Sequence, residues 1–280
     1  MKVAVIGAGT MGIGIAQVVA SAGYDVMLIS DHEASLKAGL GRLNANLDKA
    51  MAKGGMSAEQ KAACLGHVKT SSTISDVGGA GILIEAVPEE LKIKSAVISE
   101  AEKYLDKNAI IATNTSSISI STLSNSLKDP SRFLGLHFFN PAPVMKVIEV
   151  VLGEKTSAET VNNAKSFVET LSKTPVEVKD SPGFISNRIL MIYINESINA
   201  FDQGIADRDA IDTIARLGFH HPMGPLELAD FIGLDVCMDI MDAIYQQSND
   251  EKFKPSPLLV RMVKEGRLGR KNKKGFYDYP

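Results

Sequence analysis

The chain has 280 residues, of which 45% are hydrophobic and 22% charged, a composition typical of globular proteins rather than disordered or collagen-like ones. Its 30 basic and 33 acidic side chains leave a net charge of −3, which gives no overall excess for binding nucleic acid. The two cysteines, Cys64 and Cys237, form no CxxC motif, so neither a disulfide framework nor a thiolate metal site is expected. No apolar run comes near the roughly 20 residues that cross a bilayer, and we expect a soluble, cytoplasmic protein.

Short apolar segments alternate with longer amphipathic ones in the first part of the chain. The apolar segments predict strands over 2–6, 25–29, 81–86, 109–112, 133–137, 147–152 and 175–178. The amphipathic segments predict helices over 11–22, 33–53, 58–65, 91–104, 119–126 and 158–171. Alternation of this kind predicts an α/β fold, with a mainly parallel sheet that helices cover on both faces.

The pattern changes near residue 182, beyond which there is almost no strand signal. The helices expected there cover 184–203, 207–216, 225–247 and 256–265. The sequence therefore predicts two domains, an α/β domain of residues 1–182 and an all-α domain of residues 183–280.

A glycine-rich motif, Gly7-Ala8-Gly9-Thr10-Met11-Gly12, lies directly between the first predicted strand and the first predicted helix. Its glycines allow a tight turn, close approach of the backbone to a pyrophosphate, and close packing of the helix on the strand. The helix N-terminus adds N–H groups and the positive end of its dipole, which attract phosphates. The motif predicts a dinucleotide-binding domain of the Rossmann type, with Gly7, Gly9, Thr10, Met11 and Gly12 at the cofactor.

Asp31 stands 19 residues beyond Gly12, at the end of the second predicted strand. A carboxylate at this point can hydrogen-bond the adenosine ribose hydroxyls, and it would repel a 2′-phosphate. Since no arginine follows it, NAD is predicted as the cofactor in preference to NADP. The alternative interpretation is a glycine turn with an unrelated surface aspartate.

Polar side chains also gather at the carboxyl ends of later strands, where open α/β sheets bind ligands. Asn114 and Ser116 follow one predicted strand, and His137 ends the next. Glu149 lies in the following apolar run, where a hairpin return would bring it to that histidine. An imidazole can take a proton from an alcohol as hydride leaves, and a carboxylate on its other nitrogen fixes the tautomer and stabilises the imidazolium. His137 and Glu149 are thus a candidate acid–base dyad, with a purely structural histidine as the alternative.

Five motifs occur together and in order, at 5–12 (VIGAGTMG), 114–117 (NTSS), 137–143 (HFFNPAP), 182–188 (PGFISNR) and 221–225 (HPMGP). In these motifs the chain resembles the 3-hydroxyacyl-CoA dehydrogenase family, and within it the stand-alone bacterial enzymes for 3-hydroxybutyryl-CoA. The resemblance extends from residue 1 to the closing segment 275–277 (GFY).

The resemblance implies roles for residues of both predicted domains. The catalytic pair of the family corresponds to His137 and Glu149. A serine and an asparagine that contact the substrate's oxygen atoms in relatives correspond to Ser116 and Asn187. The alternative for Asn187 is an ordinary amide on a helix surface.

Further contacts with the cofactor and with coenzyme A are implied in the same way. Family contacts with NAD correspond to Glu89, Lys94 and Asn114, the last beside the nicotinamide ribose, although Glu89 and Lys94 could instead be a solvated pair at a helix start. Lys49 and Lys53 are four residues apart and therefore share one helix face. They resemble the lysines with which the family contacts coenzyme A, although lysines on a helix are often simply solvated.

The leading hypothesis is an NAD-dependent oxidoreductase of fatty-acid or butanoate metabolism that interconverts (S)-3-hydroxybutyryl-CoA and acetoacetyl-CoA. One alternative is a dehydrogenase of another β-hydroxy acid, such as L-gulonate or 6-phosphogluconate, against which the two lysines argue. Another is a non-catalytic NAD-binding protein, which predicts decay of the His–Glu pair, yet both residues are present. No metal site is expected, because His220 and His221 are adjacent and no carboxylate stands at a metal-ligand spacing.

The helical domain is also expected to form a homodimer. A domain of residues 183–280 is a thin layer, which can cover only part of its apolar helix faces internally, and a twofold partner would cover the rest. Its first helix is expected to bring Asn187 to a cleft that faces His137. The apolar residues that indicate the interface are Leu226, Leu228, Phe231, Ile232, Val236, Ile240 and Ile244.

Overall fold

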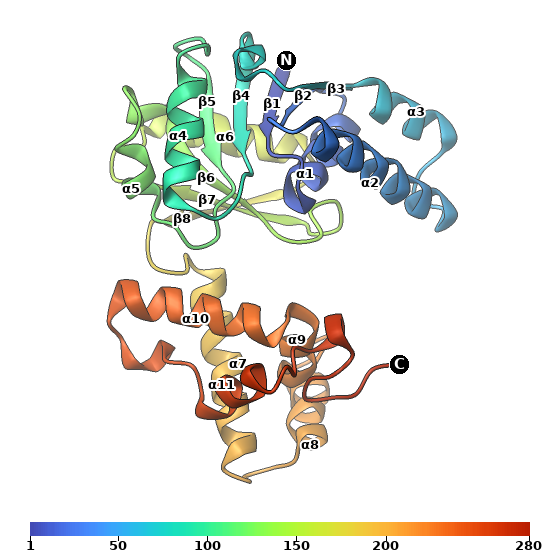
Figure 1. The fold of residues 1–280 in the computed structure, drawn as a ribbon, viewed down its shortest axis with the longest axis vertical. Coiled ribbons are helices and arrows are strands. Elements are labelled where there is room, and N and C mark those ends of the chain that lie inside the picture. The colour runs from blue at the N-terminus through green and yellow to red at the C-terminus, as the bar shows by residue number, and fades with distance from the viewer. The chain divides into compact units, whose positions relative to one another are not determined.

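The computed structural model describes residues 1–280, which form two units (Figure 1). The first unit is Met1–Asp180 and the second is Ser181–Pro280. The sequence predicts the border after residue 182, within the same segment. None of the helices is both long and apolar enough to span a membrane.

The first unit contains one sheet, built from β1 (Lys2–Ile6), β2 (Asp25–Ile29), β3 (Val68–Ser71), β4 (Ala80–Glu85), β5 (Ile110–Thr113), β6 (Phe133–Phe138), β7 (Val147–Leu152) and β8 (Thr174–Lys179). The strand order is β3-β2-β1-β4-β5-β6-β7-β8. Neighbouring strands are parallel, except for the antiparallel pair β6–β7. The order reverses at β1, between β2 and β4, and such a switch point is where open α/β sheets bind ligands.

Helices lie on both faces of this sheet, namely α1 (Thr10–Ser21), α2 (Glu33–Ala52), α3 (Ala58–Gly66), α4 (Leu91–Glu102), α5 (Ile120–Ser124) and α6 (Ala158–Thr170). Figure 1 shows α4 in front of the sheet and α6 behind it. Alternate strand residues such as Val5, Ile84 and Leu136 share one core cluster with α1, α2 and α6. The intervening residues, such as Leu83 and Phe133, are buried on the opposite face, where α4 contacts β4 and α5 contacts β6. The predicted α/β fold of the Rossmann type is confirmed.

One strand of the sheet, β3, is not predicted from the sequence. It has a single strongly apolar residue, Val68, while Lys69 and Thr70 are exposed. The strand lies at the edge of the sheet and pairs only with β2, so it can be short and polar without exposing core. Each of the strands that the sequence does predict overlaps a strand of the structure.

The second unit is helical, with α7 (Ser186–Asp202), α8 (Arg208–Thr213), α9 (Pro225–Ile232), α10 (Leu234–Ser248) and α11 (Pro257–Lys264). Leu226 and Met241 are among the fully buried residues of its core. The prediction of one helix over 225–247 is wrong, because Gly233 interrupts it with a φ of +109°, which glycine adopts readily. A π-helical turn, Ile214–Gly218, follows α8.

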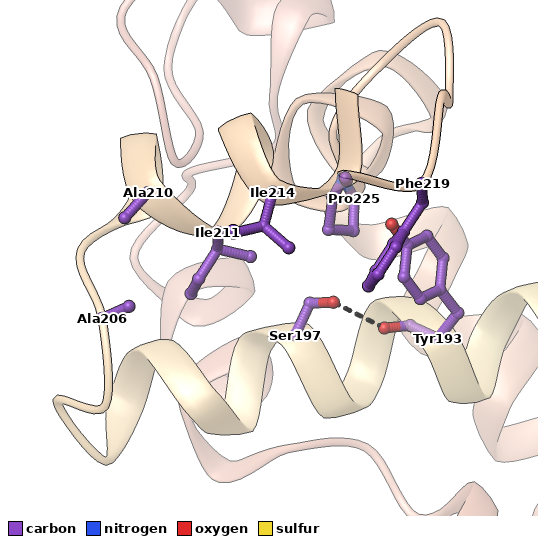
Figure 2. Close-up of a pocket in the computed structure, with 9 residues that line it drawn as sticks. Tyr193, Ser197, Ala206, Ala210, Ile211, Ile214, Phe219 and Pro225 are labelled. Atoms are coloured by element: carbon purple, nitrogen blue, oxygen red, sulfur yellow. Dashed lines mark hydrogen bonds between the residues drawn. The ribbon is translucent and has the colours of Figure 1, made fainter. Parts of the chain in front are cut away.

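A mainly apolar pocket of about 210 Å³ opens in the second unit, and we call it the α7 pocket. Figure 2 shows Tyr193 and Ser197 of α7 on one side of it and Ile211, Ile214 and Pro225 on the other. The hydroxyl of Ser197 donates to the carbonyl oxygen of Tyr193 at 2.7 Å, so the pocket presents mainly hydrocarbon.

The last residues of the chain are fastened to α9 by a buried aspartate, Asp230, in a contact that we call the C-terminal clasp. Its carboxylate accepts the backbone N–H groups of Phe276 and Tyr277, both at 2.9 Å. The hydroxyl of Tyr279 donates to the same carboxylate at 3.0 Å. Gly275 is needed for this approach, since a Cβ there would lie 1.9 Å from Oδ1 of Asp230. Burial raises the pKa of the Asp230 carboxyl, and the three donors partly offset this effect.

A second buried aspartate, Asp212 at the end of α8, joins the clasp to the start of α9. Its two oxygens accept the N–H groups of Leu226 at 2.9 Å and Glu227 at 3.0 Å, which lack acceptors within their own helix. The hydroxyl of Tyr277 donates to Oδ2 of Asp212 at 2.9 Å. Phe276 and Tyr277 therefore pack with the core of the second unit.

Candidate active site

The glycine motif forms the sharp turn between β1 and α1. Gly7 has a φ of +110°, and its N–H donates to the carbonyl oxygen of Ile29, at the end of β2, at 2.8 Å. A Cβ on Gly7 would lie 2.4 Å from the carbonyl oxygen of Ala86. A Cβ on Gly12 would lie 1.8 Å from the carbonyl oxygen of Gly7. Both positions therefore require glycine.

The N-terminus of α1 is suited to an anion. Gly9 is its N-cap and supplies no side-chain acceptor, and the first turn contains no acidic residue. The N–H groups of this first turn, which includes Thr10 and Met11, have no acceptors within the helix. A Cβ on Gly9 would meet no atom within 4 Å, so there is room beside the turn. These features fit the pyrophosphate of a dinucleotide.

Asp31 follows the end of β2, the strand to which the glycine turn is hydrogen-bonded. Its side chain is 85% exposed, and the nearest basic group is His32 at 3.7 Å. An exposed carboxylate in this place can accept hydrogen bonds from ribose hydroxyls. The ends of β1 and β2 thus carry the groups that NAD requires.

Strand pairing brings the candidate dyad together. β6 and β7 run antiparallel, and His137 lies directly opposite Glu149 in their register. Nδ1 of His137 is 2.6 Å from Oε2 of Glu149, and only 8% and 2% of the two side chains are exposed. A carboxylate can only accept, so Nδ1 carries the hydrogen of this bond. Charge-assisted hydrogen bonds of this kind are strong when they are shielded from water.

The loop after β5 lies beside the end of β6. Asn114 is its first residue, and its side-chain oxygen accepts the N–H of Phe138 at 2.9 Å. The backbone N–H of Asn114 donates to the carbonyl oxygen of Glu85 at 2.8 Å. These bonds join the carboxyl ends of β4, β5 and β6 through Asn114. Ser116 lies two residues after Asn114, close in sequence to the residue that is bonded to the strand of His137.

Glu89, just before α4, holds the same loop. Its Oε1 accepts the hydroxyl of Thr115 at 2.5 Å and the N–H of Ser116 at 2.9 Å. It also accepts the N–H of Ser117 at 3.1 Å and the hydroxyl of that residue at 3.0 Å. Burial on its own would raise the pKa of Glu89, but the Lys94 ammonium and the donors of the loop outweigh it and hold the pKa below its usual value.

The comparisons with known proteins cover the whole of this architecture. The sequence profile of the 3-hydroxyacyl-CoA dehydrogenase NAD binding domain matches residues 2–181, and the profile of the C-terminal domain of that family matches residues 183–279. The chain belongs to the 3-hydroxyacyl-CoA dehydrogenase family. The predicted cofactor, NAD, and the predicted class of enzyme, an NAD-dependent dehydrogenase, are confirmed at the level of this family.

Individual members of the family are similar over their full length. The 3-hydroxybutyryl-CoA dehydrogenase of Clostridioides difficile is 43% identical over 279 residues, which cover 100% of this chain and 99% of that protein. The crystal structure of (S)-3-hydroxybutyryl-CoA dehydrogenase PaaH1 from Ralstonia eutropha superposes with a TM-score of 0.95 at 39% identity, covering 100% and 99% of the two chains. That of FadB2 from M. tuberculosis gives a TM-score of 0.96 at 36% identity, covering 99% and 98%.

The remaining residues implied by the family resemblance lie in three different surroundings. Lys49 and Lys53 are exposed at the end of α2, in agreement with a shared helix face. Lys94 is buried and contacts two carboxylates, so it is not part of a solvated pair. Asn187 lies in the first turn of α7, in the second unit. The roles of these residues in this dehydrogenase stay predictions.

Two polar groups beside the dehydrogenase site were not expected from the sequence. Glu85 ends β4, is fully buried and contacts Lys94. A charged residue at the end of an apolar run was the available signal, since such a side chain is buried only when it is paired. Arg42 of α2 donates to the carbonyl oxygen of Ala8 in the glycine turn at 2.6 Å, and no sequence pattern indicates that contact.

Proposed function

We propose that this member of the family interconverts (S)-3-hydroxybutyryl-CoA and acetoacetyl-CoA with NAD, in the cytoplasm. The observation that carries the proposal is the buried His137–Glu149 pair at the carboxyl end of β6. It lies in the same sheet as a dinucleotide turn and an exposed Asp31. The proteins of C. difficile and R. eutropha, which are similar to this chain over their full length, are both named 3-hydroxybutyryl-CoA dehydrogenases.

The chemistry follows from the hydrogen bond of the dyad. Because Nδ1 of His137 is bonded to Glu149, we assign the proton transfer to Nε2. In the oxidation, Nε2 takes the proton of the 3-hydroxyl while the hydrogen on C3 departs as hydride, and a carbonyl forms. NAD supplies the acceptor of that hydride when it is bound. The negative charge of Glu149 stabilises the imidazolium that results, and in the reduction the imidazolium returns the proton to the oxygen.

Other residues would hold the substrate for this step. Ser116 and Asn187 are proposed to contact the oxygen atoms of the acyl group and so to fix the distance from C3 to the cofactor. Lys49 and Lys53 are proposed to contact phosphates of coenzyme A, because both residues are exposed and lie four positions apart at the end of α2.

The direct test is the oxidation of NADH, followed by its absorbance, with acetoacetyl-CoA as substrate and longer 3-ketoacyl-CoAs in parallel. We expect turnover with acetoacetyl-CoA that equals or exceeds turnover with the longer chains. No oxidation with any 3-ketoacyl-CoA would refute the proposed function, and a clear preference for a long chain would refute the proposed substrate.

Asp31→Ala is expected to weaken the binding of NADH and to reduce the discrimination against NADPH. The variant loses hydrogen bonds to the ribose, and charged hydrogen bonds contribute about 1.5–3 kcal/mol each, which corresponds to roughly tenfold or more in kcat/KM. It also loses the repulsion of a 2′-phosphate. The matched control is Asp25→Ala, which removes an exposed carboxylate from the opposite end of the same strand. A wild-type enzyme that preferred NADPH would contradict the assignment.

We infer that the partner of the second unit is another copy of this chain. Of the apolar face predicted for the interface, Leu226 and Ile244 are buried within the unit, whereas Phe231 and Val236 are 53% and 39% exposed. Beside the α7 pocket, the π-helical turn and the residue that follows it carry further exposed apolar side chains: Ile214 (58%), Leu217 (74%) and Phe219 (58%). Apolar side chains that gather in this way on one unit are typical of an interaction surface.

Light scattering during size exclusion tests the dimer. We expect twice the chain mass of 30.0 kDa for the wild type at micromolar concentration. Leu217→Asp should shift it toward the monomer, because the interface would have to bury a carboxylate. Val144→Asp, which changes an apolar side chain that is 69% exposed in the first unit, is the control and should leave the mass unchanged. A fully active wild-type protein at the mass of one chain would refute the dimer.

A further inference from the structure

The segment 139–146 connects the two strands that carry the candidate dyad. It begins two residues after His137 and ends three residues before Glu149. At its start, the ring of Phe139 lies 4.8 Å from the imidazole of His137, measured between the ring centroids. The segment is therefore in contact with the imidazole to which we assign proton transfer.

The same segment packs against α1, the helix that follows the glycine turn. Ala142 is 3% exposed and belongs to the core cluster that includes residues of α1. A Cβ on Gly14 of α1 would lie 3.1 Å from the Cβ of Ala142, so the lack of a side chain at Gly14 lets the segment approach the helix closely. The segment thus joins the dyad to the helix whose N-terminus is suited to the pyrophosphate of the cofactor.

A single turn gives the segment its shape, and Lys173 holds that turn. The N–H groups of Val144 and Met145 both donate to the carbonyl oxygen of Pro141, at 3.0 and 3.1 Å. The carbonyl oxygens of Ala142 and Met145 accept no backbone N–H group. Lys173, which lies between α6 and β8, supplies the missing donors, since its ammonium is 2.8 Å from the carbonyl oxygen of Ala142 and 2.5 Å from that of Met145.

Lys173 makes these contacts without a counter-charge. Burial lowers the pKa of its ammonium, and no neighbouring carboxylate offsets this effect. Its hydrogen bonds go only to the two carbonyl oxygens of the segment. A lysine can use its N–H donors in this way to satisfy the last carbonyl groups of a helical turn. The side chain therefore fixes the shape of the segment rather than forming an ion pair.

We propose that Lys173 is a positioning residue, which holds the segment 139–146 so that the imidazole of His137 and the glycine turn keep the relative placement that hydride transfer needs. The proposal rests on the proposed function, in which His137 exchanges a proton with the substrate while the cofactor exchanges hydride. Because a misplacement of about 1 Å can slow a reaction by about 10²-fold, a lysine that acts through this segment alone can control turnover.

The test is the rate of one turnover in the variant Lys173→Met, which removes the ammonium and keeps an unbranched side chain. With enzyme in excess of NADH and with saturating acetoacetyl-CoA, the first-order rate constant for NADH oxidation should fall about 10- to 100-fold. This rate constant does not depend on the fraction of enzyme that is folded, so a loss of stability alone would leave it unchanged.

Two further variants serve as controls for this rate. Lys173→Arg keeps a cation with N–H donors, and its rate constant should stay within about threefold of the wild type. Lys179→Met changes an exposed lysine at the end of β8 and should match the wild type.

Hydrogen exchange of a peptide that spans 138–147 measures the segment itself, in the enzyme without cofactor or substrate. Exchange should be several-fold faster in Lys173→Met than in Lys179→Met, because the turn has lost its donors. The dissociation constant of NADH should stay within about threefold of the wild type, since the glycine turn and Asp31 are unchanged.

Other outcomes would overturn the proposal. A wild-type rate constant in Lys173→Met would refute the positioning role, even if the Tm fell. Unchanged exchange would show that Lys173 does not hold the segment. A loss of NADH affinity as large as the loss of rate would make Lys173 a cofactor residue instead. If the wild type oxidised NADH with no 3-ketoacyl-CoA, the proposed function would fail, yet the exchange experiment would still decide whether Lys173 holds the segment.

Discussion

His137→Gln is expected to lower kcat for acetoacetyl-CoA by about 10²–10⁴-fold, the usual contribution of a general acid–base group. The glutamine amide cannot take up or release a proton at neutral pH, so the substrate oxygen must exchange its proton with water. The affinity for NADH, measured by fluorescence titration, should change little, because the glycine turn and Asp31 are left intact. Glu149→Gln should also lower kcat strongly, since its amide can accept from Nδ1 but cannot stabilise an imidazolium by charge.

The chain offers a matched control for this pair. Nδ1 of His67 is 2.9 Å from Oδ1 of Asp25, a distance close to that in the dyad, but these two side chains are 35% and 77% exposed. Asp25 is the first residue of β2, so it lies at the amino end of that strand, whereas the proposed site lies at the carboxyl ends of the strands. His67→Gln should therefore leave kcat unchanged. Wild-type turnover in His137→Gln, with NADH binding intact, would show that the dyad is not catalytic.

Gly12→Ala is expected to abolish NADH binding and to destabilise the first unit. The added methyl group would lie 1.8 Å from the carbonyl oxygen of Gly7, a backbone atom that cannot rotate away. Overpacking of this kind costs about 1–3 kcal/mol and occasionally more, so the Tm should drop by several degrees. Thermal unfolding and fluorescence titration of NADH measure the two effects.

Two other glycines separate the loss of cofactor from the loss of stability. Gly9→Ala adds a methyl group where no atom lies within 4 Å, so the Tm should stay unchanged. The same methyl group would obstruct the pyrophosphate and weaken the binding of NADH by at least roughly tenfold. Gly41→Ala lies on the exposed face of α2, where alanine is favoured by about 1 kcal/mol, and should raise the Tm without affecting NADH. Tight NADH binding by Gly9→Ala would place the pyrophosphate elsewhere.

The fold could be predicted from the sequence where local pattern and tertiary burial agree. The strand at 147–152 is apolar except for Glu149, its four central residues are buried, and its predicted and observed limits coincide. The sequence does not indicate the break at Gly233, because apolar residues continue in helical spacing on both sides of it and its positive φ depends on how α9 and α10 pack. The sequence does not indicate β3 either, because its environment, the sheet edge, is a property of the assembled sheet.

The candidate site divides in the same way. The glycine turn and Asp31 could be recognised, because a fixed spacing between a strand and a helix determines the chemistry there. The contact of His137 with Glu149 could be anticipated from a hairpin return. The burial of Lys94 could not, since it depends on Glu85, which β4 places next to α4 only after the sheet has formed.

The C-terminal clasp bears on how the second unit forms during synthesis. Residues 276–280 supply donors to Asp230 and Asp212, and Phe276 is 3% exposed within the core. Residues 276–280 follow every helix of the second unit in the sequence, so they are synthesised after those helices. Until they are made, the buried carboxylate of Asp230 lacks its three donors, Asp212 lacks the hydroxyl of Tyr277, and the core lacks the ring of Phe276. The second unit therefore reaches its native state only after residues 276–280 have been made, while the first unit can fold earlier. A variant without residues 276–280 would thus retain the sequence of every helix from α7 to α11 and yet be a target for proteolysis.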